Sequence, residues 1–317
     1  EADDYYVQGD DSGRAGVERS YEKQLRGEKG VEILLRDVHG RIKGKYDDGA
    51  SDVAPVSGKN LKLSLDINLQ AYGEKLMKNK VGSIVMIEPE TGEVLCLVTS
   101  PNYDPSLLVG RQRGKNHRML EENPQTPLID RSITGFYPPG STFKPTQGLI
   151  FLQEGVITPS TMYTCAHGYT YSIKRKPACH GHASPLSLVP ALATSCNSFF
   201  CWGVHDMLYN RRRYPTVQEG FEVWKNHLVS MGYGYPLGID LPGEKRGYIP
   251  NSKVYDKLHR RWNSSTIISI AIGQGEISAT PLQICNLAAT IANRGYFITP
   301  HVVKEVQDTP LDSLYTQ

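Results

Sequence analysis

The chain has 317 residues, of which 39% are hydrophobic and 21% are charged, the composition of an ordinary folded protein. Its formal net charge of +2 gives no field that would indicate nucleic-acid binding, and the sequence has no basic tail, repeat or low-complexity tract. No apolar run approaches the ~18 residues that a membrane helix needs. The length predicts one large domain, with or without a smaller piece.

The N-terminal part of the chain is polar and rich in glycine. Its pattern predicts a short amphipathic helix at 16–25 and extended segments at 31–37 and 41–45. The apolar content of these elements is too small for an independent core. We therefore predict a pedestal or linker at 1–56 and the main domain at 57–317.

The start of the chain carries a separate expectation. Because it begins at Glu1 without a methionine, we expect a processed or engineered fragment, in which an upstream anchor or signal would lie outside this sequence.

The main domain opens with alternating residues at 61–65, which predict a strand. Asp66 follows as a predicted N-cap for an amphipathic helix. Two β-rich runs at 83–100 flank the turn sequence "EPETG", which is typical of a hairpin. The stretch at 101–133 carries Pro, Asn and Arg throughout, and we predict a loop there.

The segment "FYPPGSTFKPTQ" at 136–147 places Ser141 directly after Pro138-Pro139-Gly140, whose prolines restrict the backbone. A helix is predicted at 142–154, so Lys144 follows Ser141 by about one turn and faces the same side. Burial and the positive end of the helix dipole disfavour a charged ammonium there. A neutral Lys144 could accept the serine proton, which makes an activated nucleophile. The alternative is a proline-capped helix with an exposed lysine.

A second motif lies about 50 residues further on. Two predicted helices, "SLVPALATS" and "SFFCWGVHDML", flank the tripeptide Ser195-Cys196-Asn197. S-x-x-K combined with S-D-N and K-T-G is a pattern of penicillin-binding proteins and class A β-lactamases, and Ser195-Cys196-Asn197 is similar to its S-D-N element. The Ser195 hydroxyl could relay a proton, and the Asn197 amide could hold a substrate carbonyl. Further on, "SMGYGYPLGIDLPGEKRGYIPN" predicts a long loop and "TPLQICNLAATIANRG" a helix.

Together, "RSITGFYPPGSTFKP", "SCNSFF", "GYGYPLGIDLPGEKRGYIPN" and "IGQGEISATPLQ" resemble a class B penicillin-binding protein, with a closer likeness to the elongation-type penicillin-binding protein 2. "SGRAGVERSYEKQLRGEKG" and "RDVHGRIKG" resemble the end of that family's N-terminal pedestal. The resemblance implies an α/β transpeptidase fold, an antiparallel sheet with helices on both sides. It also implies a remnant pedestal and a membrane helix upstream.

The same resemblance implies a serine D,D-transpeptidase that cross-links peptidoglycan stem peptides at the periplasmic face of the bacterial inner membrane. Ser141 would attack the D-Ala–D-Ala carbonyl, Lys144 would be the base, Ser195 would relay the proton, and Asn197 would orient the peptide. β-Lactams would trap the serine. The implied partners are stem peptides and the glycosyltransferase of the rod-shape (elongation) complex, with no nucleic acid and no cofactor for the chemistry.

One departure from the family pattern is the absence of Lys-Ser/Thr-Gly anywhere in the sequence. We expect the chain to be truncated before this motif, with the sheet incomplete at its C-terminal end. Loss of one oxyanion donor typically costs ~10²–10³ in rate, so the fragment alone should be a poor catalyst. Two alternatives remain open, a serine β-lactamase and a penicillin-sensing binding domain.

The cysteines call for a separate explanation. Cys165, Cys179 and Cys196 lie among several histidines, whereas Cys96 and Cys285 sit in apolar runs and are expected in the core. Three thiolates and one imidazole would make a closed structural zinc site. We predict zinc bound by the set Cys165, Cys179, His182 and Cys196, with His180 as the other candidate imidazole. A Cys165–Cys179 disulfide or unconnected thiols are the alternatives.

Overall fold

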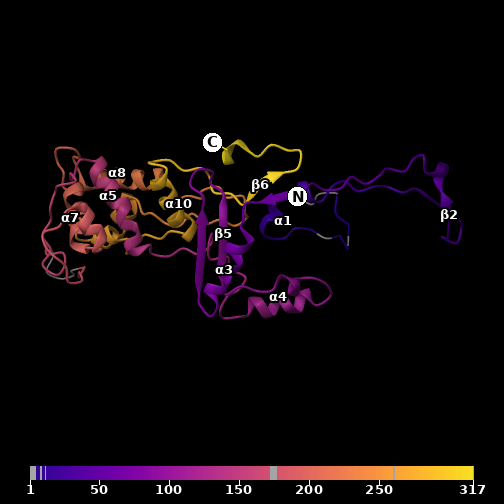
Figure 1. The fold of residues 1–317 in the computed structure, drawn as a ribbon, viewed down its shortest axis with the longest axis horizontal. Coiled ribbons are helices and arrows are strands. Elements are labelled where there is room, and N and C mark those ends of the chain that lie inside the picture. Colours follow the sequence, from indigo (N-terminus) through magenta and orange to yellow (C-terminus); the bar gives the residue numbers. More distant parts are fainter. Residues whose placement is uncertain (1–4, 8, 11, 172–176, 260, 317) are drawn as a thin grey trace.

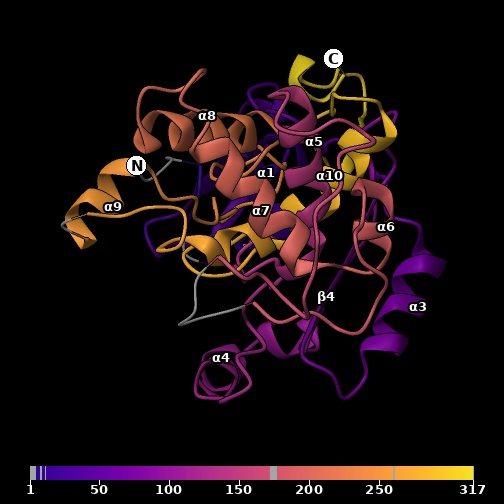
Figure 2. The same ribbon diagram turned by 90° about the vertical axis from the view of Figure 1, so that its left-hand side faces the viewer.

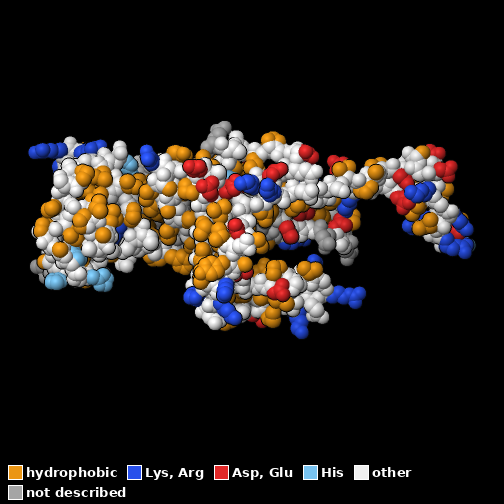
Figure 3. All heavy atoms as spheres, viewed as in Figure 1, with side chains coloured by type: hydrophobic (Ala, Val, Ile, Leu, Met, Phe, Trp, Pro, Cys, Tyr) orange, Lys and Arg blue, Asp and Glu red, His pale blue; other side chains and the backbone are white. Residues whose placement is uncertain are grey.

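The structure is a computed structural model, and it describes residues 5–7, 9–10, 12–171, 177–259 and 261–316. The molecule is elongated (Figure 1). A helical lobe forms one end, a sheet region lies in the middle, and a narrow arm extends at the other end. Acidic and basic side chains gather on the arm and the middle, and histidines gather at the outer end of the helical lobe (Figure 3).

Among its described residues, the N-terminal region contains two short α-helices, a two-stranded antiparallel hairpin and the 3-10 helix η1 (Tyr46–Gly49). The predicted single helix at 16–25 is wrong, because Tyr21 leaves helical geometry at φ −111° and ψ 22° and divides it. The Tyr21 hydroxyl donates to Asp240 Oδ2 over 2.9 Å, which ties the region to the main domain. The elements are α1 (Gly16–Ser20), α2 (Glu22–Leu25), β1 (Leu34–Arg36) and β2 (Ile42–Lys45).

The middle region is built around the predicted hairpin, which begins one residue before the predicted range, at Gly82. Its strands pair antiparallel from Gly82 opposite Ser100 to Ile87 opposite Val94. The helix before the hairpin begins as predicted, because the Asp66 side chain accepts the N–H groups of Asn68 and Leu69. The elements are β3 (Leu61–Leu63), α3 (Ile67–Met77), β4 (Gly82–Ile87), β5 (Val94–Ser100) and β6 (Val303–Val306), with β3 paired to β6.

Helices cover both faces of the β4–β5 hairpin, as predicted. On one face, α3 approaches closely, since a Cβ on Gly73 would lie 2.9 Å from Val98. Side chains alternate between the faces of a strand, and Leu97 and Val85 point to the other face. There they join an apolar cluster with Leu282 of α10 (Pro281–Ala292).

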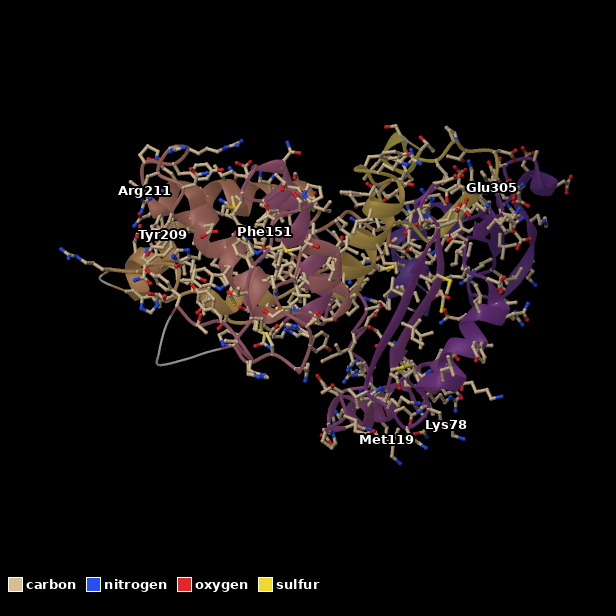
Figure 4. The ribbon with its side chains drawn as sticks, turned by 60° about the vertical axis from the view of Figure 1, so that its left-hand side comes forward. Lys78, Met119, Phe151, Tyr209, Arg211 and Glu305 are labelled. Carbon is tan, nitrogen blue, oxygen red and sulfur yellow. The ribbon has the colours of Figure 1, made fainter. Side chains whose placement is uncertain are left out.

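The stretch at 101–133, predicted as a loop, contains the helix α4 (Arg113–Glu121). The prediction was wrong because surrounding prolines and asparagines concealed a short run of good helix formers from Arg118 to Glu121. Leu120 is the buried residue of this helix. Figures 1 and 2 show α4 standing apart from the other labelled helices, and Figure 4 labels Met119 on it.

The helical lobe holds most of the apolar core. Its largest buried side chains are aromatic and include Phe151, labelled in Figure 4. None of the helices among the described residues has both the length and the apolarity to cross a membrane. The lobe's α-helices, besides α10, are α5 (Lys144–Gln153), α6 (Leu188–Ala193), α7 (Asn197–Leu208), α8 (Val217–Ser230) and α9 (Ser252–Leu258). The described part of the lobe also holds the 3-10 helices η3 (Gly140–Phe143) and η4 (Ile268–Ile272).

Candidate active site

The predicted nucleophile lies on η3, directly before α5. Ser141 is exposed, whereas Lys144, the first residue of α5, is only 1% exposed. Gly140 adopts a left-handed φ of 59°, a conformation that glycine reaches at little cost. Pro145 falls in the first turn of α5, where a missing N–H leaves no intrahelical bond unmade.

The approach to Ser141 is held by the segment that follows η4. Tyr137 and Ala279 exchange two backbone hydrogen bonds of 2.9 Å each. The Gly140 N–H donates to the Gly273 carbonyl over 2.8 Å. These bonds supply the stiffness that the two prolines of the approach indicated.

The second motif lies in the turn between α6 and α7. Ser195 has a left-handed φ of 53°, an uncommon conformation for a residue with a side chain. Cys196 is the N-cap of α7, and its sulfur accepts the Phe199 N–H. Asn197 is the first residue of the helix, so both polar side chains of the motif start from the turn at the helix N-terminus.

The Lys144 side chain connects the two motifs. Its Nζ donates to the Ser195 carbonyl over 2.7 Å, to Ser195 Oγ over 2.8 Å and to Asn197 Oδ1 over 2.6 Å. Ser195 Oγ in turn donates to Ser141 Oγ over 2.9 Å. The sequence predicted that Lys144 would face the same side as Ser141 and could accept its proton. Among the described residues, the hydrogen bonds that connect the two side chains run through the Ser195 hydroxyl.

The electrostatics of this group favour proton exchange. Burial lowers the pKa of Lys144, and the nearby thiols of Cys179, Cys196 and Cys201 partly oppose that shift. Lys144 Nζ also lies 5.7 Å from the ring centroid of Phe200, a contact that favours the charged form. A lysine that loses its proton more readily can act as a base toward a hydroxyl within reach.

The four predicted metal ligands come together beside this site. The ligand atoms of Cys165, Cys179, His182 and Cys196 all lie within 4.8 Å of one another. Cys179 Sγ and Cys196 Sγ are 3.9 Å apart, close to the roughly 3.8 Å between two sulfurs on a tetrahedral zinc. All six cysteines are free, so none of them is in a disulfide.

Two details of the cluster suit a metal. His182 Nδ1 lies 2.7 Å from the Ala183 carbonyl, while the buried Nε2 has no hydrogen-bond partner among the described residues. A backbone bond at one ring nitrogen leaves the lone pair of the other free for a metal. Burial tends to raise the pKa of Cys179, but the Ser198 N–H and the contacts with His182 and the other thiols lower it overall. A thiolate is the form that binds metal.

The cluster and the lysine are joined through one side chain. Asn197 Oδ1 accepts from Lys144, and Asn197 Nδ2 donates to the Ala178 carbonyl over 2.7 Å. Ala178 directly precedes the cluster residue Cys179. The position of the Asn197 amide therefore depends on the loop that carries the cysteines.

Sequence reasoning did not assign a role to the segment around Gly273. A Cβ there would lie 2.3 Å from the Gly140 carbonyl, and its φ is 68°. The Gly-Gln-Gly sequence at 273–275 was the available signal, because close backbone approach is a reason for glycine.

Two profiles of known protein families match this chain. The sequence profile described as "Penicillin binding protein transpeptidase domain" matches residues 82–317. The chain belongs to the penicillin-binding-protein transpeptidase family. A profile described as "Penicillin-binding Protein dimerisation domain" matches residues 1–63. The fold, with helices on both faces of an antiparallel hairpin, agrees with this membership.

Individual relatives and solved structures agree with this family assignment. The chain is 34% identical to the peptidoglycan D,D-transpeptidase MrdA of Acinetobacter baumannii over 92% of its own length and 42% of the relative's. It is similar to the PBP2–MreC complex structure from Helicobacter pylori, with a TM-score of 0.79 and 28% identity over 96% of this chain and 55% of that one. It also resembles a chain of a peptidoglycan synthase complex that coordinates polymerization and crosslinking, with a TM-score of 0.80 and 28% identity over 97% of this chain and 54% of that one. The chain thus spans less than half the length of this curated relative.

Proposed function

We propose that the protein is a serine D,D-transpeptidase that cross-links peptidoglycan stem peptides, with Ser141 as the acylated residue. The observation that carries the proposal is the hydrogen-bonded series from Lys144 Nζ through Ser195 Oγ to Ser141 Oγ. Membership of the transpeptidase family and the likeness to named D,D-transpeptidases support the reaction type.

The residues divide the reaction as follows. Ser141 Oγ bonds to the carbonyl carbon of the penultimate D-Ala, and its proton passes to neutral Lys144 by way of Ser195. The proton then returns through Ser195 to the nitrogen of the terminal D-Ala as that bond breaks. An amine of a second stem attacks the ester and restores the Ser141 hydroxyl. Asn197 orients the peptide and holds Lys144.

The setting of this activity is part of the proposal. Residues 1–56 form the pedestal and 57–317 the transpeptidase domain, at the periplasmic face of the inner membrane and anchored upstream. β-Lactams acylate Ser141 in place of the stem peptide. The proposed partners are the rod-shape glycosyltransferase and other elongation proteins, in line with the MreC complex and the synthase complex among the structural relatives.

We further propose that zinc is bound by Cys165, Cys179, His182 and Cys196. The clustered donors and the unpartnered His182 Nε2 support this assignment. The metal would play a structural role, because four protein ligands leave no open position for substrate. It would hold the described segments 165–171 and 177–182 against the N-terminus of α7.

The experiment for the main proposal is covalent labelling of the protein at its native length with fluorescent penicillin. Ser141→Ala should abolish the label, whereas Ser160→Ala, an exposed serine of the same lobe, should keep it. Mass spectrometry of the labelled peptide locates the acyl group. Stoichiometric labelling of folded Ser141→Ala would refute the assignment, and rapid turnover of the label would favour a β-lactamase.

A further inference from the structure

One fully buried amide in the lobe has no part in the proposed chemistry. Gln147 lies on α5, three residues after Lys144, and is 0% exposed. A glutamine rarely occupies such a position, because its polar groups lose water and must find partners. The amide therefore either serves packing alone or holds particular neighbours in place.

Both ends of the Gln147 side chain are hydrogen-bonded. The Trp224 Nε1–H of α8 donates to Gln147 Oε1 over 2.7 Å, and Gln147 Nε2 donates to the Ile270 carbonyl of η4 over 3.0 Å. α8 runs beside α5 in Figures 1 and 2. One side chain thus fixes three segments that lie far apart in the sequence.

Two series of contacts connect the Gln147 amide with residues on either side of Ser141. The Ile270 carbonyl also accepts the Gly273 N–H over 3.1 Å, and the Gly273 carbonyl accepts the Gly140 N–H over 2.8 Å. Gly140 directly precedes the nucleophile. In the second series, the Trp224 ring lies edge-on to Phe143, with the ring centroids 6.4 Å apart. Phe143 is two residues after Ser141.

We propose that Gln147 is a positioning residue that sets the place of Ser141 relative to Lys144 and Ser195. This inference rests on the proposed transpeptidase function. The amide holds η4 at a fixed distance from α5, and η4 holds the backbone directly before the nucleophile. Loss of the amide lets Ser141 move while Lys144 keeps its own bonds to Ser195 and Asn197.

The test separates binding of penicillin from acylation. Pre-covalent affinity and the acylation rate constant are measured by stopped flow for Gln147→Leu and Trp224→Phe in the protein at its native length. Misplacement by about 1 Å can cost up to ~100-fold in rate, so we expect the acylation rate to fall by about tenfold to a hundredfold. The pre-covalent affinity should change by less than about threefold, because no substrate contact is removed.

Trp262→Phe is the matched control. Trp262 is 7% exposed, and its Nε1–H also donates to a side chain, Asp256 Oδ1, over 2.7 Å. It lies against Phe221, which also lies against Trp224. Asp256 is exposed, so this variant loses an indole hydrogen bond of the same length in a less buried setting. It should lower the unfolding temperature without slowing acylation.

The outcomes are distinct. If Gln147→Leu and Trp224→Phe acylate at the unaltered rate below their unfolding temperatures, or slow no more than Trp262→Phe, the positioning role is refuted. Should Gln147→Leu fail to fold, Trp224→Phe alone decides, because it removes one partner of the amide. Absence of acylation at Ser141 in the unmodified protein would instead refute the proposed function.

Discussion

Two neighbouring histidines give a direct test of the proposed zinc site. His182 belongs to the cluster, and its Nε2 is buried without a partner. His180 is exposed, and its atoms are outside the cluster. We predict that His182→Ala loses metal and stability, whereas His180→Ala keeps both.

The expected loss of stability in His182→Ala follows from the linkage between metal binding and folding. Changing a group that merely supports a ligand costs 10–100-fold in metal affinity, so loss of a direct ligand should cost at least about 100-fold. At saturating metal, a 100-fold weaker affinity lowers the free energy of unfolding by about 2.7 kcal/mol. At about 2–4 °C per kcal/mol for a domain of roughly 150–250 residues, the size of the matched transpeptidase domain, the unfolding temperature of His182→Ala should fall by roughly 5–10 °C.

The assay combines elemental analysis, thiol counting and thermal unfolding of protein purified without chelator. About one zinc per chain is expected in the unmodified protein and in His180→Ala, and much less in His182→Ala. A chelator should lower the unfolding temperature of the first two proteins but have little further effect on His182→Ala. A metal-free protein with a Cys165–Cys179 bridge would refute the site.

Three predictions concern the nucleophile. Ser195→Ala removes the hydroxyl between Lys144 and Ser141, so its acylation rate should fall by ~10²–10⁴ with pre-covalent affinity retained, as measured by stopped flow. Acylation should rise with pH as Lys144 loses its proton, and its midpoint should lie below the ordinary lysine pKa of ~10.4, because burial lowers the pKa of Lys144; a midpoint at or above that value would contradict the assignment of the base. Gly273→Ala places a Cβ 2.3 Å from the Gly140 carbonyl, so both acylation and the unfolding temperature should fall, and an unaltered labelling rate would show that this contact is dispensable.

Much of the site could be predicted because its signals are local. Spacing and proline chemistry indicated Ser141 and Lys144, and an Asp at a helix start indicated the cap at Asp66. The metal ligands were predicted from the clustering of cysteines and histidines, and the structure brings all four together. Membership of the family was recognised from the quoted motifs, and the matching profile confirms it.

The rest depends on contacts between distant segments. Spacing placed Lys144 on the same helix face as Ser141, but only the fold shows that its three bonds go to Ser195 and Asn197. Gln147 gave no signal, because a glutamine in an apolar helix has no preferred partner until Trp224 is brought beside it. Tertiary packing overrides local preference in the same way at Tyr21, where the predicted helix divides.

The last prediction concerns the coupling between the proposed zinc site and Lys144. The Asn197 amide is the shared element, since Oδ1 accepts from Lys144 over 2.6 Å and Nδ2 donates to the Ala178 carbonyl over 2.7 Å. If loss of the metal lets Ala178 move, the Asn197 amide loses the hydrogen bond that orients it toward Lys144. A chelator should therefore slow acylation of the unmodified protein while Ser141 stays reactive.

Asn197→Ala decides whether the coupling runs through this side chain. The variant should acylate slowly whether or not metal is present, because both bonds of the amide are already gone. The chelator's effect on the rate should then be much smaller than in the unmodified protein, as expected for two changes that share one interaction. An equal chelator effect in both proteins would mean that the loop influences the site by another route, such as the Cys196 N-cap of α7.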